Sequence, residues 1–467
     1  MKRLSILLTL LVGLLAAIIP VAAQSAEWES ATLIYESQAV DQPTLVADAS
    51  GALHLVWTGV TRNEHAEAQQ SLLYAQFTPD GWSTPNDVIV MEDVSVRQPV
   101  AAVDNDGILH VIWGGSGLNY SYVPTWEAGS AANWSEPIKI GTGDIINSPT
   151  ALRIDANGVL HVLVALVGEG ETYYIQSPDS GKTWYAPQRI SSSPEGTASD
   201  TTAIAIASDG TLHAVWSRVE TPIAYPPLGV YYAYSADSGQ TWTIEQPVAD
   251  ADYGEPFIIV DANDNVHIAY NGRVGVGGKY HRVLLAGETE WSQAVPLAAP
   301  ETNGLNGPPE LVADAEGDVH FIAGGDRSVY FATWRDGRWG SILNLRDTLI
   351  GSLAETERTT MKLVAGNQLH AVFENNKRQL WHTWRVLDVP PIALQVYGDL
   401  EAEEVAIETA RAEVVAVDNP FLVEPSLLPD PTPTTPADPN QSLVSAIVAA
   451  LAVLLLAVGV QLVRHRL

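Results

Sequence analysis

The chain has 467 residues, 46% of them hydrophobic, and 24 Lys and Arg stand against 55 Asp and Glu, for a formal net charge of −31. So acidic a chain is not expected to bind nucleic acid through a basic surface, because phosphate binding needs clustered positive charge. It contains no cysteine, which excludes a disulfide framework and any cysteine-ligated metal.

The N-terminus has the pattern of an export signal. A short basic segment, Met1–Arg3, precedes an apolar run, Leu4–Val21, and Val21-Ala22-Ala23 supplies small residues at the −3 and −1 positions of a cleavage site. This predicts a secretory signal peptide over residues 1–23, with an uncleaved signal anchor as the alternative. In an exported chain, the lack of cysteine favours a bacterial protein.

A unit of two strands joined by a tight turn recurs seven times. Its first copy, Pro43–Gly59, reads PTLVADASGALHLVWTG. A period near 50 residues with several short strands per repeat is typical of a β-propeller. Each copy contains one histidine: His54, His110, His161, His213, His267, His320 and His370.

The repeat also predicts how the ring closes. A third strand such as Ser71–Phe77 and a fourth that opens with a tryptophan such as Trp82 follow the first six copies, but the seventh lacks the fourth strand. Residues Trp28–Ile34 have the pattern of that missing strand. We therefore predict an all-β fold, a β-propeller of seven four-stranded blades over residues 27–388, closed by the N-terminal strand.

The recurring Asp and His have structural interpretations. Asp48 stands three residues before Gly51, as a type I turn favours. The histidine lies in the second strand, and both faces of a blade are covered by its neighbours. We expect it to be buried and hydrogen-bonded, and one histidine per blade is too widely spaced to share a metal. No metal and no cofactor is predicted.

Two turns carry a sharper motif, S-x-D-x-G-x-T-W. This pattern resembles the Asp-box, or BNR repeat, of sialidases and related propellers. The resemblance implies a sialidase-like propeller superfamily in which the motif is a structural hairpin turn remote from the active site. The motif residues are Ser177, Asp179, Gly181 and Trp184, and Ser235, Asp237, Gly239 and Trp242.

The same resemblance sets a test for catalysis. Sialidases hold the substrate carboxylate with three arginines and use a Tyr–Glu pair as nucleophile and an Asp as acid/base. Their usual Arg-Ile-Pro is absent here, since Arg153-Ile154-Asp155 and Arg189-Ile190-Ser191 do not match, and six blades are usual in that family. Catalytic residues are therefore not assigned.

The C-terminal part changes character after Asp388. Residues 389–442 are acidic and Pro-rich, which predicts an extended stalk; a strand or a short helix is possible within Leu400–Val417. Residues 443–463 are 21 uncharged residues, long enough for a transmembrane helix, and residues 464–467 form a short basic cytoplasmic tail.

The loops between the repeats hold the candidate binding residues. In propellers, ligands usually meet the face formed by the loops that enter each inner strand and those that follow the second strand. Here these loops are rich in arginine, which indicates recognition of an anionic or polyhydroxylated ligand; the alternative is that each arginine pairs with a neighbouring acid. The candidates are Arg62, Arg97, Arg218, Tyr225, Arg273, Arg327, Arg358, Asp200 and Glu255.

Three functions remain open from the sequence. The first is a membrane-anchored extracellular propeller, monomeric and single-pass at the cell membrane, that binds a glycan or an extracellular protein on its loop face. The second is a sialidase-like exo-glycoside hydrolase that acts on cell-surface or environmental glycans. The third is an envelope spacer without a ligand.

Overall fold

The computed structural model describes residues 27–37, 40–62, 68–90, 96–115, 117–141, 151–166, 170–221, 224–272, 278–298, 307–325, 328–345, 356–395, 397 and 422–423. The predicted signal peptide, transmembrane helix and cytoplasmic tail lie outside these residues. In the described part of the chain, no helix is both long and apolar enough to cross a membrane.

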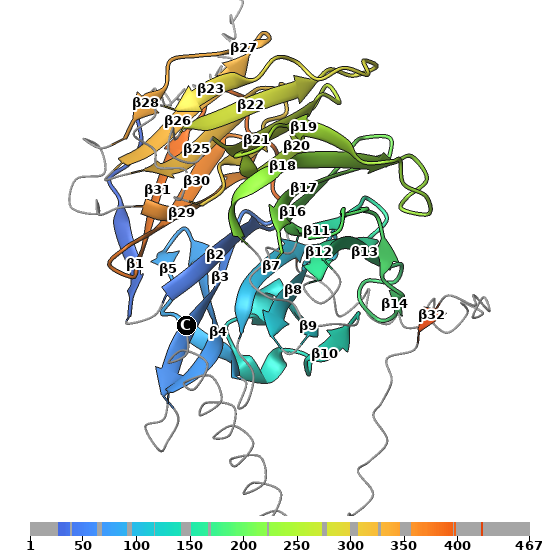
Figure 1. The fold of residues 1–467 in the computed structure, drawn as a ribbon. Helices are drawn as coiled ribbons and strands as arrows, with labels where there is room; N and C mark the ends of the chain where they lie inside the picture. The colour runs from blue at the N-terminus through green and yellow to red at the C-terminus, as the bar shows by residue number, and fades with distance from the viewer. Residues whose placement is uncertain are drawn as a thin grey trace, which may run out of the picture. The chain divides into compact units, whose positions relative to one another are not determined.

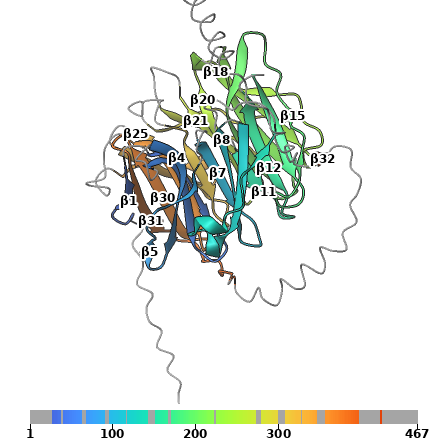
Figure 2. The ribbon, with the colours of Figure 1, turned by 90° about the horizontal axis from the view of Figure 1, so that it is seen from below.

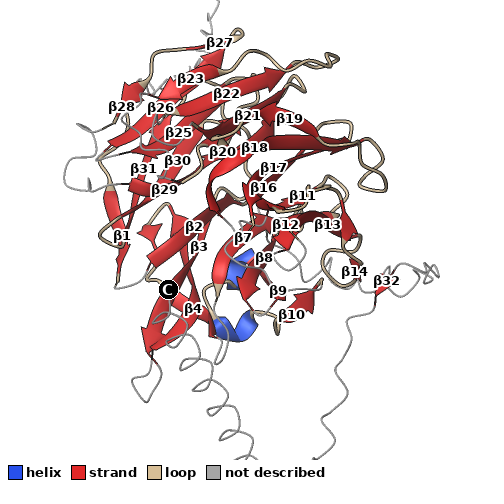
Figure 3. Ribbon diagram, in the orientation of Figure 1, coloured by secondary structure: helices blue, strands red, loops and turns tan. Residues whose placement is uncertain are grey.

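Seven of the eight sheets that the described strands form are the blades; these seven are antiparallel and follow one another in chain order around a common centre (Figures 1, 2 and 3). Blade 1 contains β2 (Val40–Ala47), β3 (Leu53–Arg62), β4 (Ala68–Thr78), β5 (Gly81–Trp82) and β6 (Asn86–Val90), and blade 2 contains β7 (Arg97–Val103), β8 (Ile108–Gly115), β9 (Gly117–Pro124) and β10 (Ile138–Ile140). Blade 3 contains β11 (Ala151–Ile154), β12 (Leu160–Leu166), β13 (Glu171–Ser177) and β15 (Gln188–Arg189). The short β14 (Trp184–Tyr185) lies between β13 and β15 in the chain and belongs to a separate two-stranded sheet. Two short 3-10 helices, η1 (Thr125–Glu127) and η2 (Ala131–Asn133), connect β9 to β10.

Blades 4 to 7 repeat the arrangement. Blade 4 contains β16 (Thr197–Ile206), β17 (Leu212–Glu220), β18 (Ala224–Ser235) and β19 (Gln246–Ala249), and blade 5 contains β20 (Gly254–Val260), β21 (Val266–Asn271), β22 (Lys279–Leu284) and β23 (Val295–Ala298). Blade 6 contains β24 (Glu310–Ala313), β25 (Val319–Gly325), β26 (Ser328–Arg335), β27 (Arg338–Trp339) and β28 (Leu343–Asn344). Blade 7 contains β29 (Thr356–Val364), β30 (Gln368–Asn375) and β31 (Gln379–Val386). The prediction of a seven-bladed propeller is confirmed.

The N-terminal strand completes the last blade, as predicted. Strand β1 (Thr32–Glu36) pairs antiparallel with β31, and Thr32 lies opposite His382. The pairing begins earlier, because the amide of Glu29 donates to the carbonyl of Trp384 at 2.8 Å. In Figure 1 the blue β1 therefore lies beside the orange strands of blade 7. The two ends of the ring are joined by hydrogen bonds rather than left as sheet edges.

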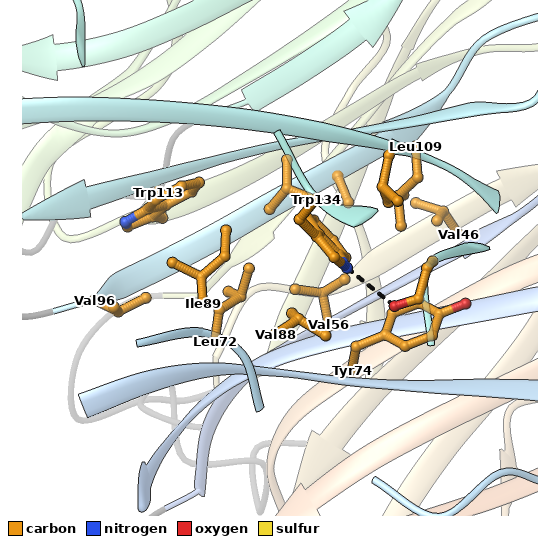
Figure 4. Packing of buried hydrophobic residues seen from close by; sticks show 14 residues of the cluster. Val46, Val56, Leu72, Tyr74, Val88, Ile89, Val96, Leu109, Trp113 and Trp134 are labelled. Atoms are coloured by element: carbon orange, nitrogen blue, oxygen red, sulfur yellow. Dashed lines mark hydrogen bonds between the residues drawn. The ribbon is translucent and has the colours of Figure 1, made fainter. Parts of the chain in front are cut away.

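Adjacent blades bury their facing side chains against each other. Between blades 1 and 2, Val56, Leu72 and Tyr74 meet Leu109 and Trp134 in one cluster (Figure 4). The indole Nε1 of Trp134 donates to the carbonyl of Ala128 at 3.0 Å, so its polar atom is satisfied inside the cluster. Because both faces of each blade are covered, the strands carry apolar residues on both sides.

The antiparallel topology gives the propeller two distinct faces. We call the face with the connections into each inner strand, and from each second to each third strand, the loop face. The opposite side, which we call the turn face, carries the turns between first and second strands, such as Asp48–Gly51, and those between third and fourth strands, such as Asp179–Lys182.

The recurring histidines are buried and hydrogen-bonded, as predicted. His54 is fully buried, with Nδ1 2.7 Å from the hydroxyl of Tyr74 and Nε2 3.2 Å from Oδ2 of Asp48. The other oxygen of Asp48 accepts the amides of Ser50 and Ala52. The turn-forming aspartate is therefore also a partner of the histidine, which ties the turn to the third strand.

The buried histidines of the propeller, including His382 of β31, predict a loss of stability in acid. Burial lowers the pKa of His213 to about 4 and that of His382 to about 3, and it also lowers the pKa of His370 to about 4. Between pH 6.5 and 4 the unfolded chain therefore binds more protons than the folded chain, so the free energy of unfolding falls as the pH falls. We expect a loss on the order of 2–3 kcal/mol per histidine across this window, measured by urea unfolding at stepped pH. A His213→Gln variant should show a shallower dependence; an unfolding free energy constant from pH 7 to 4.5 would contradict the prediction.

The two S-x-D-x-G-x-T-W turns form the same side-chain network. Oδ1 of Asp179 accepts from the Ser177 hydroxyl at 3.1 Å and from the Thr183 amide at 2.8 Å. Asp237 accepts the corresponding bonds in blade 4, which lower its pKa to about 2. Hydrogen bonds that favour the ionised carboxylate explain this direction. Both turns lie on the turn face, on the side opposite the loop face.

The start of the predicted stalk is attached to the turn face. The amide of Ile392 donates to the carbonyl of Ala365 in blade 7, and that of Gln395 donates to the carbonyl of Ala49 in blade 1, both at 2.7 Å. The ring of Tyr397 lies 5.9 Å from that of Trp126 in blade 2. Further along the chain, β32 (Leu422–Val423) pairs antiparallel with β14 of blade 3.

Candidate functional site

The inner strands of the seven blades surround a cavity of about 200 Å³. Its lining includes Gln42–Leu45 from β2, Gln98–Ala101 from β7 and Glu255–Phe257 from β20. Residue 255 lies near the start of its strand, where the chain enters from the loop face. The volume is below the roughly 300–1,000 Å³ of sites for drug-sized ligands, so it suits a single ring or substituent of a larger molecule.

Arg153 of β11 supplies an unpaired cation to this cavity. Its Nη1 donates to the carbonyl of the neighbouring Leu152 at 2.8 Å, and no carboxylate of a described residue forms an ion pair with it. Burial lowers its pKa, which the charge of Glu310 partly opposes. A guanidinium has five donors in a fixed plane, and the bond to Leu152 uses one of them, so among the described residues Arg153 has further donors for a ligand.

A second cation in the cavity is paired. Nζ of Lys362 on β29 lies 2.7 Å from Oε1 of Glu310 on β24, and Oε2 of Glu310 accepts the amide of Met361 at 3.0 Å. This pair joins the inner strands of blades 6 and 7. The charges of Lys362 and Glu310 therefore oppose each other, whereas Arg153 has no ion-pair partner among the described residues.

Glu255 lies in a buried polar group on the side of blade 5. Its Oε2 accepts from the side-chain amide of Asn271, whose Oδ1 accepts from Nζ of Lys279 at 2.5 Å. Nζ of Lys279 also donates to the carbonyl of Gly307 at 2.8 Å. Burial raises the pKa of Glu255 against the opposing charges of Lys279 and Arg358, and it lowers the pKa of Lys279 to about 8. Desolvation thus outweighs pairing for both groups.

The predicted candidates divide into three sets. Arg358 and Glu255 line the cavity, and the buried Asp200 lies close enough to Glu255 for its charge to raise the pKa of that residue. The side chains of Arg62 on β3, Arg97 on β7 and Tyr225 on β18, and all of Arg273 and Arg327, lie outside the described residues.

Arg218 lies elsewhere in blade 4. It is 4% exposed, its Nη2 is 2.8 and 2.7 Å from the two carboxylate oxygens of Glu245, and its Cζ is 3.9 Å from the centroid of the Tyr231 ring. This is the paired arrangement that the sequence analysis left open as the alternative for a loop arginine. Arg218 does not line the cavity.

The sequence analysis missed Arg153 and Lys362. Both stand eight residues before the histidine of their repeat, where they face it across the strand pair. The same position holds Val46, Ala102, Ala205, Ile259 and Val312 in the other repeats. A charged residue at a position that is apolar in the other repeats was the sequence signal that could have identified Arg153 and Lys362. Among the described residues, no group of His, Asp or Glu side chains is arranged to hold a metal ion.

The comparisons with known proteins show the fold alone. No protein-family model and no curated protein sequence matches this chain. A lectin, BP39L from Burkholderia pseudomallei, is similar over 78% of this chain and 99% of its own, with 12% identity and a TM-score of 0.56. A polysaccharide lyase, a PL25 ulvan lyase bound to -[GlcA(1-4)Rha3S]-, is similar over 81% and 98%, with 11% identity and a TM-score of 0.51.

The intramolecular trans-sialidase from Ruminococcus gnavus covers 79% of this chain with 12% identity, at a TM-score of 0.43. The chain is therefore a seven-bladed β-propeller that shares its fold with a lectin and a polysaccharide lyase.

Proposed function

We propose that this protein is an extracellular glycan-binding β-propeller, whose ligand enters the central cavity from the loop face. The guanidinium of Arg153 carries this proposal: it is half-buried in a small cavity and forms no ion pair with a described carboxylate, so a ligand that supplies acceptors could pair with it. The folds of a lectin and of a polysaccharide lyase support the ligand class. A protein ligand is the alternative occupant of the loop face.

The setting of the molecule is part of the proposal. We propose that the protein is a bacterial monomer, anchored at the cell membrane by the apolar residues 443–463, with the propeller outside and the four C-terminal residues inside. We also propose that the two S-x-D-x-G-x-T-W turns are Asp-boxes, since both form the hairpin network that this motif implies.

A sialidase-like hydrolase remains the second candidate function, and one observation favours binding over it. Two arginines, Arg153 and Arg358, reach the cavity, and Glu255 accompanies them. The described lining residues include no tyrosine, so they do not supply the Tyr–Glu pair that such an enzyme would use.

The proposal predicts that Arg153 is needed for binding. The full chain should bind members of a glycan array, and titration of the strongest ligand should show at least a tenfold higher Kd for Arg153→Ala, since hydrogen bonds to charged groups contribute about 1.5–3 kcal/mol. The control is Arg189→Ala, because the Arg189 side chain is 61% exposed and 3.9 Å from Glu171, outside the cavity. Equal affinities for both variants would contradict the site. Turnover of a fluorogenic sialoside that Arg153→Ala abolishes would favour the hydrolase.

A further inference from the structure

The inner strands share an unusual backbone conformation at one position of the repeat. Gln42, Gln98, Thr201 and Glu255 each stand twelve residues before the histidine of their repeat. Their φ angles are 58°, 49°, 34° and 49°. Each lies at an irregularity in the pairing of the first and second strands, as between Asp41 and Thr44. The bulge is therefore a feature of the repeat and not of one blade.

None of these four residues is glycine, the residue that adopts this conformation most readily. Residues with a side chain are disfavoured in the left-handed region, and glycine adopts it without that cost. Pro43, Pro99 and Pro256 follow three of the four and restrict them further. A strained conformation that recurs without glycine indicates that the side chains themselves are needed.

All four residues line the cavity. Gln42, Gln98, Thr201 and Glu255 belong to its lining, and so does Arg358, the residue at the same position of the seventh repeat. Bulges change the direction in which a side chain points, and they occur often beside binding sites. The four residues, which we call the bulge ring, thus contribute two amides, a hydroxyl and a carboxylate to the lining of the cavity.

Neighbouring groups hold the bulges in place. The hydroxyl of Thr44 donates to the carbonyl of Pro99 at 2.6 Å, which links blade 1 to the bulge of blade 2. The hydroxyl of Ser217 lies 2.6 Å from that of Thr201 and accepts the amide of Glu255 at 2.9 Å, which links the bulges of blades 4 and 5. The surroundings therefore fix a conformation that the residues alone would not favour.

We propose that the bulge ring recognises the hydroxyl groups of a single sugar residue inserted into the cavity. This inference rests on the proposed function and specifies it. The oxygens of amides and carboxylates accept hydrogen bonds from hydroxyl groups, and the amide NH2 groups also donate to hydroxyl oxygens. A ring of such side chains is therefore suited to a polyhydroxylated ligand. The cavity of about 200 Å³ limits the recognised unit to one ring, with the remainder of the glycan outside on the loop face.

The test is Gln42→Gly in the full chain, with Asp336→Gly as the matched control. Asp336 also has a left-handed φ, 51°, but it is exposed in the turn between β26 and β27, on the turn face, and does not line the cavity. Relief of strain should raise the unfolding midpoint of both variants by about 1–3 °C. Only Gln42→Gly should raise the Kd for the array glycan, by tenfold or more. Gln98→Gly should repeat that result.

The outcomes separate this inference from the proposed function. If the wild-type chain binds a glycan in an Arg153-dependent manner and Gln42→Gly and Gln98→Gly bind it equally well, the bulge ring is structural and this inference is wrong. If the wild-type chain binds no glycan, the proposed function fails, and the inference fails with it. A stabilised Gln42→Gly variant with lost binding supports both.

Discussion

Replacement of Trp28 by alanine is expected to lower the free energy of unfolding by about 3–5 kcal/mol, the usual range for a buried tryptophan. Trp28 is 6% exposed, and its ring meets Phe331 of blade 6 edge-on at 5.2 Å. It packs in one cluster with Met361 and Leu387 of the last part of the propeller. The lost stability therefore comes from the contact between blades 6 and 7 and from the segment that leads into the closing strand.

The matched control for this prediction is Trp126→Ala. Trp126 is 47% exposed and packs beside Tyr397 on the turn face. Its loss is expected to be about 1 kcal/mol, because partial burial contributes in proportion to the apolar area removed from water. Urea unfolding monitored by circular dichroism measures both. Equal losses would show that the N-terminal segment does not close the ring in solution.

Gly181→Ala is the second change with a large expected effect. Gly181 has a φ of +87°, and a Cβ there would lie 1.8 Å from the hydroxyl oxygen of Tyr120 in the preceding blade. That hydroxyl is 2.8 Å from Nδ1 of His110, so it has little freedom to move. We expect a loss of about 2–4 kcal/mol, from left-handed strain together with the clash.

Gly210→Ala separates these two causes. Gly210 has nearly the same φ, +85°, and no atom lies within 4 Å of a Cβ built on it. Its loss should be about 1 kcal/mol, from the backbone alone. The difference between the two variants in urea unfolding then measures the contact between blades 2 and 3. Equal losses would mean that the tyrosine moves aside freely.

Much of the fold could be predicted because the repeat depends on residues that lie close together in the chain. The Asp and Gly of the turn, the alternating apolar residues and the period near 50 residues are properties of short segments. The match between Trp28–Ile34 and the Trp82 strand predicted the closing strand, and the pairing of Thr32 with His382 confirms it. The burial of His54 followed from the same alternation.

The candidate site was predicted only in part, because its residues come from different repeats. Glu255 and Arg358 were identified from their loops, and both line the cavity. Arg218 has the same loop signature, yet it turns toward Glu245 within its own blade. Arg153 was interpreted only as a mismatch to a sialidase motif.

The sequence by itself determined the number of blades, the closing strand and the structural role of the repeated histidine, since each depends on patterns within about fifty residues. Tertiary structure alone decided which charged residues share the axis. Seven strand starts, about 50 residues apart along the chain, meet around one cavity of about 200 Å³. Whether an arginine pairs with a carboxylate of its own blade, as Arg218 does, or lines the cavity without an ion-pair partner among the described residues, as Arg153 does, depends on distances between segments that no local pattern records.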